Sequence, residues 1–340
     1  MIIEATQTFS PGNIELLIYF LRQLEIRKIP SVVYLGHDYT YNLIDKLKYS
    51  HVSIKKSSGF ETIIRLLKKR EGVLFFCSFP PFVKQKKSLV YFHSPFFAKP
   101  KRFLRDGSLS SKIKLIRLLV HFQIRLFKNN VDHFYCQTKS IEQDLKSAFK
   151  NIKVEIVPFY NDSDLIKIQH ERDTEFGFDF FYPATPDVHK NYFRLFEAVK
   201  LLAQKDKIKL CVTIDPKSAR YVQKINEINH ELNYEAIVNV GRVKKERVLD
   251  LYLNSKALIF PSLEESLGLP LIEAAFISCP ILGSDLPYIY NVVENPIVFN
   301  PYDVEEIADT MKRFLNGEFD YVKQKNKIEN KVDQIINYLK

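Results

Sequence analysis

The stretch at residues 255–285 constrains the fold most, because it sets two carboxylates eight positions apart around a turn that feeds a helix. The apolar run at 257–260 predicts a short buried strand, polar residues then break it, and Pro270 suits the first position of a new helix. Glu265 is therefore expected in the loop and Glu273 in the first helical turn.

The predicted helix start has the properties of a phosphate site. Free N–H groups from 267 to 271 would converge with the positive end of the helix dipole, and Gly268 would let a ligand approach the backbone closely. An acidic side chain that can bind hydroxyl groups lies on either side. These are the parts that a sugar nucleotide requires.

Strands and helices alternate along the chain, which predicts an α/β protein with parallel sheets. The 340 residues exceed what a single core usually supports, and residues 160–177 are polar without a core-facing pattern. We therefore predict one domain at 1–165, a second at 166–316 and a C-terminal segment at 317–340 that is helical from 319 onward. Strands are expected near 2–5, 31–35, 51–54, 73–77, 89–92, 132–136, 154–158, 178–182, 208–214, 236–240, 257–260, 280–282 and 297–299, and helices near 14–27, 61–70, 112–127, 141–149, 192–203, 216–231, 244–253, 270–277 and 304–314.

Composition excludes several function classes. No G-x-G occurs, which disfavours a dehydrogenase, and no G-x-x-x-x-G-K occurs, which excludes a P-loop kinase. The sequence shows neither a signal-peptide pattern nor an apolar run of membrane-spanning length, so a cytoplasmic location is expected. The cysteines lack metal or redox spacing and are interpreted as reduced core residues: Cys77, Cys136, Cys211 and Cys279.

The net charge of +10 requires a partner or a local explanation. It is not gathered into a nucleic-acid reading element, and no zinc-finger or RNP signature occurs, so no nucleic-acid partner is predicted. Residues 99–128 are strongly basic, and helix 111–128 either lies on an anionic membrane surface or packs as an ordinary helix with solvated lysines. Its apolar stripe at near-helical spacing comprises Ile113, Ile116, Leu119, Val120, Gln123, Ile124 and Phe127.

The segment SKALIFPSLEESLGLPLIEAAFISCPILGSD resembles the E-x7-E signature of retaining glycosyltransferases of family 4. The resemblance implies the GT-B fold, in which two Rossmann-like, doubly wound parallel-sheet domains face a central crevice and a C-terminal helix crosses back to the first domain. It also implies transfer of a sugar from a UDP- or GDP-linked donor to a lipid-linked or glycan acceptor, as in O-antigen and capsule assembly. We therefore expect a peripheral enzyme at the inner face of the cytoplasmic membrane.

The same resemblance assigns donor contacts in the second domain. Glu273 would hold the ribose hydroxyls, and Glu265 would meet the donor sugar and support positive charge at its anomeric carbon. Val243 is similar to the strand end that frames the base. Backbone amides would contact the diphosphate or sugar hydroxyls at Leu267, Gly268 and Leu269.

A lysine before the first helix of the nucleotide domain matches Lys190, which would offset the charge on the leaving diphosphate. Asn191 would cap the helix that follows. Many members carry a phosphate-clamping arginine about five residues earlier, a position where this chain has Thr185 and Pro186. His189 and Arg242 are the two candidates to replace that arginine.

Two places in the first domain would face the donor. The loop at 8–13 resembles a glycine-rich donor loop, with Gly12 alone where a pair is common. His93 follows an apolar strand, at the edge where open α/β sheets bind ligands, and the resemblance implies a contact with the donor sugar. A buried structural histidine is the other interpretation of His93.

The family's mechanism, front-face attack by the acceptor hydroxyl with its proton passing to the departing phosphate, implies that neither a cofactor nor a metal is needed. Asp162, Ser163 and Asp164 form a D-x-D, which we interpret as a solvated turn. A sugar-nucleotide epimerase shares the fold but distributes its carboxylates and histidines differently. The alternative to an enzyme is a non-catalytic GT-B accessory subunit, which the missing arginine and Ser266 in place of a glycine keep open.

Overall fold

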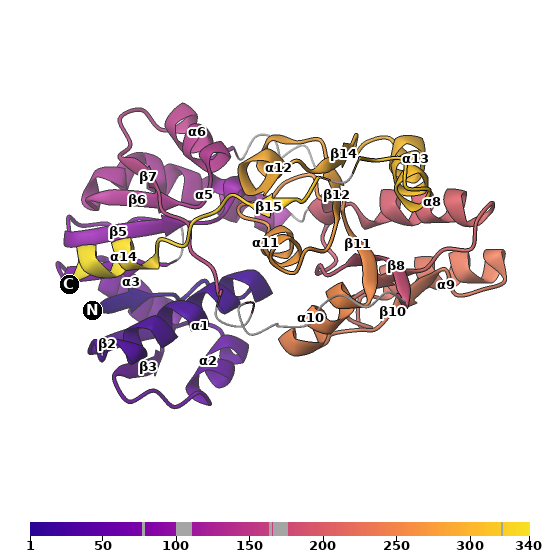
Figure 1. Ribbon diagram of the computed structural model, residues 1–340. Coiled ribbons are helices and arrows are strands. Elements are labelled where there is room, and N and C mark those ends of the chain that lie inside the picture. The colour runs from indigo at the N-terminus through magenta and orange to yellow at the C-terminus, as the bar shows by residue number, and fades with distance from the viewer. Residues whose placement is uncertain (77–78, 100–110, 163–164, 166–175, 321) are drawn as a thin grey trace. The chain divides into compact units, whose positions relative to one another are not determined.

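The computed structural model describes residues 1–340 except 77–78, 100–110, 163–164, 166–175 and 321. The chain forms two compact units, one made of Met1–Asn161 with Glu329–Lys340 and the other of Asp162–Ile328. Each unit is built on its own parallel sheet (Figure 1). The prediction of an α/β protein with two parallel-sheet units is therefore confirmed.

The first unit has a seven-stranded sheet in the order β3-β2-β1-β4-β5-β6-β7. The order reverses beside β1, which is the hallmark of a doubly wound sheet. Its strands are β1 Ile2–Glu4, β2 Ser31–Leu35, β3 Val52–Lys56, β4 Glu71–Phe75, β5 Lys86–Phe92, β6 His133–Cys136 and β7 Val154–Ile156. Its helices are α1 Pro11–Ile26, α2 Asp38–Asp45, α3 Gly59–Leu66, α5 Ser111–Phe127, α6 Lys139–Ala148 and α14 Val332–Leu339, with short 3-10 turns at Pro95–Phe97 and Lys128–Asn130.

The second unit has a six-stranded sheet in the order β10-β9-β8-β11-β12-β14, which reverses between β8 and β11. Its strands are β8 Phe178–Tyr182, β9 Leu210–Val212, β10 Ile237–Asn239, β11 Ser255–Phe260, β12 Ile281–Ser284 and β14 Ile297–Phe299. Its helices are α8 Tyr192–Ala203, α9 Ala219–Leu232, α10 Lys245–Leu253, α11 Leu269–Phe276, α12 Pro287–Val292 and α13 Val304–Leu315, with a 3-10 turn, η3, at Val188–Lys190.

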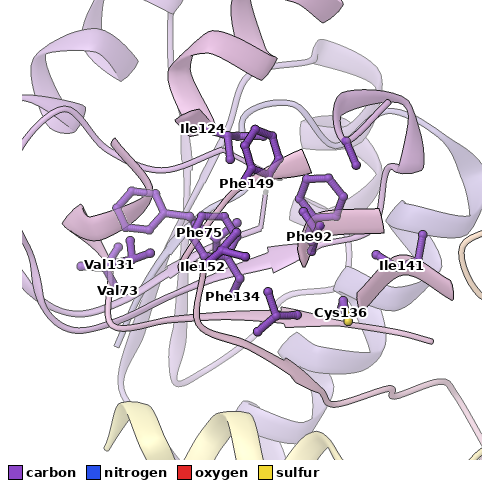
Figure 2. Close-up of a cluster of buried hydrophobic side chains, with 14 of the residues drawn as sticks. Val73, Phe75, Phe92, Ile124, Val131, Phe134, Cys136, Ile141, Phe149 and Ile152 are labelled. Atoms are coloured by element: carbon purple, nitrogen blue, oxygen red, sulfur yellow. The ribbon is translucent and has the colours of Figure 1, made fainter. Parts of the chain in front are cut away.

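One core cluster of the first unit joins the sheet to three helices on the same side of it. Its aromatic members include Phe75, Phe92 and Phe134 from the strands, and Ile124 from α5 and Ile141 from α6 pack against them (Figure 2). Leu66 at the end of α3 belongs to the same cluster. Helices α3, α5 and α6 therefore cover one face of this sheet.

The C-terminal segment differs from the prediction of a continuous helix after residue 319. Lys325–Asn326 forms β15, which pairs with β13 at Val293–Glu294, and only Val332–Leu339 is helical. The Gln324 side chain explains the interruption, because it accepts from the Ile281 amide at 2.6 Å and donates to the Ile281 carbonyl at 3.0 Å. Helix α14 then contacts β4 and β5 in the first unit.

Two short helices were missed by the sequence analysis. Helices α2 and α12 were not predicted, because each is short and α12 has only six residues. The apolar stripe of α5, for which two interpretations were left open, is only partly buried: Ile124 is fully buried, whereas Ile113, Ile116 and Leu119 are 41%, 46% and 59% exposed.

Candidate active site

The loop between β11 and α11 is shaped by a left-handed glycine. Gly268 has φ +69° and precedes the helix, and a Cβ there would come within 3.0 Å of Leu271 Cδ1. Helix α11 starts at Leu269, so Pro270 is its second residue and not the predicted first. Glu273 consequently lies in the second helical turn, because no acidic residue occupies the first.

Not every N–H predicted for this turn is available to a ligand. Pro270 has no N–H, and the Leu271 N–H donates to the Gly268 carbonyl at 2.9 Å. The candidate phosphate donors therefore narrow to the amides of Leu267, Gly268 and Leu269, which lie at the positive end of the α11 dipole.

Glu265 and Lys190 form an ion pair although they lie far apart in the sequence. The Lys190 ammonium is 2.5 Å from Glu265 Oε1, and the two side chains are 15% and 10% exposed. Lys190 follows β8 and Glu265 follows β11, the neighbouring strands at which the sheet order reverses. Ligands of open α/β sheets bind outside the carboxyl ends of strands at such a switch point.

Backbone hydrogen bonds hold the two loops together at this pair. The Leu263 amide donates to the His189 carbonyl at 2.7 Å, and the Tyr182 hydroxyl donates to the Lys190 carbonyl at 2.9 Å. The Lys190 ammonium also lies 5.8 Å from the centroid of the Phe260 ring. The position of Lys190 is thus fixed from both sides of the switch point.

Asn191 occupies the N-cap position of α8 without the predicted capping bond. Its backbone is left-handed, with φ 59° and ψ 28°, a conformation that asparagine tolerates better than most residues. The side chain instead donates to the Pro301 carbonyl at 2.7 Å and accepts from Arg194 at 2.9 Å.

Glu273 is held by two residues that the sequence analysis missed. Its side chain is 8% exposed, Lys245 pairs with Oε1, and the Tyr252 hydroxyl donates to Oε2 at 3.1 Å. The sequence offered one signal for Lys245, because a cation at a helix start is unfavourable to the dipole. Tyr252 gave no such signal, since it lies in an apolar helical position.

The two candidates for the missing phosphate clamp are engaged by carboxylates. His189 Nδ1 lies 3.4 Å from Asp187 Oδ1. Burial raises the pKa of Asp187, but His189, the Val188 amide and the charge of Lys190 together lower it by more, so the pKa falls overall. Arg242 is 56% exposed, with its Nε 3.5 Å from Asp215 Oδ2. Val243 is half-buried and follows the turn at Gly241, which has φ +70°.

The predicted first-domain residues lie in the first unit. His93 directly follows β5 and is 8% exposed, with its ring 5.1 Å from that of Phe76 and 6.0 Å from that of Tyr91. Burial lowers the pKa of His93 to about 4, so the imidazole is neutral near pH 7. Gly12 does not lie in a loop as predicted, because α1 begins at Pro11 and takes Gly12 into its first turn.

Among the residues that the structure describes, no group of three or more His, Cys, Asp or Glu side chains is arranged to hold a metal ion. Asp162 of the D-x-D is described, whereas Ser163 and Asp164 lie outside the described residues. Cys136, Cys211 and Cys279 are buried free thiols, and burial raises the pKa of Cys136 and of Cys211 to about 12. Cys77 lies outside the described residues.

A comparison with known protein families identifies the family of the chain. The sequence profile described as "Glycosyl transferases group 1" matches residues 162–334, and the chain belongs to this family. The match begins at the second unit and includes both carboxylates and both lysines of the site.

Relatives within the family include mannosyltransferases. The chain is 28% identical over 137 residues to the serotype-specific mannosyltransferase WbdA of Escherichia coli, a match that covers 39% of this chain and 17% of WbdA. It is 34% identical over 89 residues to the O-antigen chain mannosyltransferase RfbU of Salmonella typhimurium, covering 22% of this chain and 25% of RfbU. The chain thus matches a quarter or less of the length of either relative.

Solved structures confirm the GT-B fold. Anabaena HepE, solved in complex with UDP and glucose, is 13% identical with a TM-score of 0.67 over 93% of this chain and 90% of that one. Sucrose-phosphate synthase of Thermosynechococcus elongatus is 15% identical with a TM-score of 0.61 over 93% and 89% of the two chains.

Proposed function

We propose that the protein is a retaining glycosyltransferase that moves a sugar from a UDP- or GDP-linked donor to a lipid-linked or polysaccharide acceptor in cell-surface glycan synthesis. The observation that carries this proposal is the Lys190–Glu265 ion pair, which lies at the switch point of the second sheet beside the start of α11. Membership of the glycosyl transferases group 1 family supports the reaction class.

The donor diphosphate would lie at the Leu267, Gly268 and Leu269 amides, where N–H groups and the helix dipole favour an anion. Lys190 would exchange part of its contact with Glu265 for a phosphate oxygen, and the freed carboxylate oxygen would accept a sugar hydroxyl. Glu273 would accept the ribose hydroxyls, since Lys245 and Tyr252 already hold its carboxylate in one orientation.

In the proposed reaction the acceptor hydroxyl oxygen attacks the anomeric carbon on the face from which the diphosphate leaves. The bond from that carbon to the phosphate oxygen breaks, the new glycosidic bond forms, and the hydroxyl proton passes to the departing phosphate. Lys190 would stabilise the charge that builds on the diphosphate, while Glu265 would stabilise the positive charge at the anomeric carbon. We propose that this occurs without a metal ion and that His93 contacts the donor sugar as a neutral imidazole.

A location at the inner face of the cytoplasmic membrane belongs to the same proposal, because a lipid-linked acceptor is held there. No described helix is long and apolar enough to cross a membrane. Residues 111–128, the predicted contact with an anionic surface, contain no acidic residue, and α5 spans nearly all of them.

The accessory-subunit alternative loses one of its two arguments. Ser266 would disrupt the loop if its position required the left-handed backbone of a glycine, but Ser266 is not among the described residues with positive φ. The absent clamp arginine still distinguishes the chain from many family members.

A transfer assay tests the proposed function. The protein is incubated with UDP- and GDP-linked sugars and a short mannan or lipid-linked oligosaccharide in EDTA, and the products are analysed by mass spectrometry and by NMR of the anomeric proton. We expect transfer with retained configuration from one donor and its loss in Glu265→Gln. Inverted configuration, or nucleotide binding without transfer to any acceptor, would contradict the proposal.

A further inference from the structure

Helix α5 has two apolar faces, and only one of them is used in the core. Ile124 is fully buried, Val120 packs against the same core cluster, and the Phe127 ring lies 5.3 Å from that of Phe82 in an edge contact. The Gln123 side chain on this face donates to a backbone carbonyl at 2.8 Å. The core contacts of α5 are therefore made by the face that carries Ile124.

The opposite side of α5 is an exposed apolar stripe. Leu115, Leu119, Phe122 and Leu126 are 57%, 59%, 54% and 70% exposed. Their spacing of four, three and four residues places them in one row, and at about 100° per residue this row lies opposite Ile124. Contiguous exposed rows of large apolar side chains mark interaction surfaces in soluble proteins.

A second exposed stripe lies on α3, about which the sequence analysis made no functional prediction. Phe60, Ile63 and Leu67 are 73%, 51% and 55% exposed and are spaced three and four residues apart. The helix is well formed, since Ser58 and Glu61 make a capping box at its start. These apolar side chains are therefore exposed on a well-formed helix.

The two stripes belong to neighbouring elements. Leu66 of α3 and Ile124 of α5 pack in one core cluster, which places both helices on the same side of the sheet. Phe82 connects their ends, because its amide donates to the Leu66 carbonyl at 3.0 Å and its ring contacts Phe127.

The charge around these stripes is mostly positive. Residues 111–128 contain five lysines and arginines and no acidic residue, and the exposed Lys68 and Lys69 follow Leu67 directly. Glu61, which caps the start of α3, is the acidic residue within the α3 stripe. A second copy of the chain would bring the same positive charge to this surface, whereas anionic lipid headgroups would neutralise it. The combination of apolar row and basic flanks is that of a helix lying in a bilayer interface.

We propose that the exposed stripes of α3 and α5, defined as the α3–α5 surface, insert into an anionic bilayer while the flanking lysines and arginines contact the headgroups. The surface comprises Phe60, Ile63, Leu67, Leu115, Leu119, Phe122 and Leu126. The role of this surface rests on the proposed function, because membrane binding would bring the enzyme to a lipid-linked acceptor. Vesicle binding itself is measured without donor or acceptor.

Flotation with vesicles tests the surface. The full chain is mixed with vesicles of phosphatidylcholine alone or with about one-third phosphatidylglycerol, together with variants Leu119→Glu/Phe122→Glu on α5 and Phe60→Glu/Ile63→Glu on α3. Ile26→Glu is the matched control, because Ile26 is 71% exposed on α1 and lies outside the surface. Circular dichroism and nucleotide binding by calorimetry establish that each variant is folded.

We expect the wild type and Ile26→Glu to float with anionic vesicles and to bind neutral vesicles at least about tenfold more weakly. Each double variant should bind anionic vesicles about tenfold more weakly than the wild type. Retained binding in the α3 variant would overturn the joint surface, and retained binding in both variants would overturn the inference. A wild type that fails to float, or that forms a dimer which Leu119→Glu abolishes, would also contradict it. Loss of vesicle binding with nucleotide binding intact separates this inference from the proposed function.

Discussion

The two units both bury ionised side chains, but they do so in different places. In the first unit Glu4 is 1% exposed within the sheet and accepts from Arg65 at 2.9 Å and from Arg70 at 2.6 Å. In the second unit the Lys190–Glu265 and Lys245–Glu273 pairs lie at the edge of the sheet, in loops and at helix starts. We infer that the first cluster stabilises the fold and that the second pairs are held ready to exchange partners with a ligand.

The largest expected effect is a loss of stability, and it tests whether the Glu4 cluster stabilises the first unit. Glu4→Gln leaves Arg65 and Arg70, each only 13% exposed, without their countercharge, so the free energy of unfolding should fall by about 3 kcal/mol, at the lower end of the range for breaking a buried pair. Urea denaturation measures it. If the protein stayed equally stable and instead lost nucleotide affinity, the assignment of this cluster to the fold would be wrong.

The next effect concerns the first ion pair of the second unit. Lys190→Met should lower the rate of sugar transfer by about 10²–10³-fold, because the departing diphosphate loses a preorganised cation. Lys205→Met removes an exposed lysine of the same unit and should leave the rate unchanged. Equal losses in both variants would show that general charge, and not this position, matters.

A smaller effect is expected at Lys245, which acts through Glu273. Lys245→Met should weaken nucleotide binding by about tenfold, on the scale of a charge-assisted hydrogen bond, and Lys245→Arg should restore most of it. Titration calorimetry measures both. An arginine variant as weak as the methionine variant would argue for a packing role of the lysine side chain.

The last effect is the pH dependence that His93 contributes to stability, and it is absent near pH 7. Its pKa of about 4 in the folded protein lies below the usual 6.5, so the unfolded chain takes up the proton first and stability is lost as the pH falls from 6.5 towards 4. The loss approaches about 1.4 kcal/mol per pH unit at most. His93→Asn should flatten this part of the stability curve, and an unchanged slope would show that His93 is exposed to solvent in solution.

The sequence predicted most of the second unit because its signals are local. Apolar runs define the buried strands, and Gly268 with Pro270 marks the junction that holds Glu265 and Glu273. The residue at which a helix starts is less predictable. Helix α11 starts one residue earlier than predicted, and Glu273 therefore lies in its second turn. The family resemblance assigned Lys190 and Glu265 to one donor site, but their ion pair, which joins positions 75 residues apart, was not predicted.

What the sequence left open depends on tertiary packing. Lys245 and Tyr252 meet Glu273 because α10 and α11 flank β11, and no local pattern encodes that approach. In α5 the periodicity was correctly predicted, but both of its faces are apolar, and only the burial of Ile124 distinguishes the core face from the exposed one. Segment 319–331 was misjudged because Gln324 and β15 bind it to strands far away in the sequence.

The most direct test of the central claim is calorimetry of UDP, GDP and their common sugars in EDTA, with the wild type, Glu273→Ala and the exposed control Glu235→Ala. The account predicts metal-free binding of one nucleotide by the wild type and by the control, and a loss of about 2 kcal/mol, roughly 30-fold, in Glu273→Ala. Binding that requires a divalent cation, equal affinity in Glu273→Ala, or no binding of any nucleotide would contradict it.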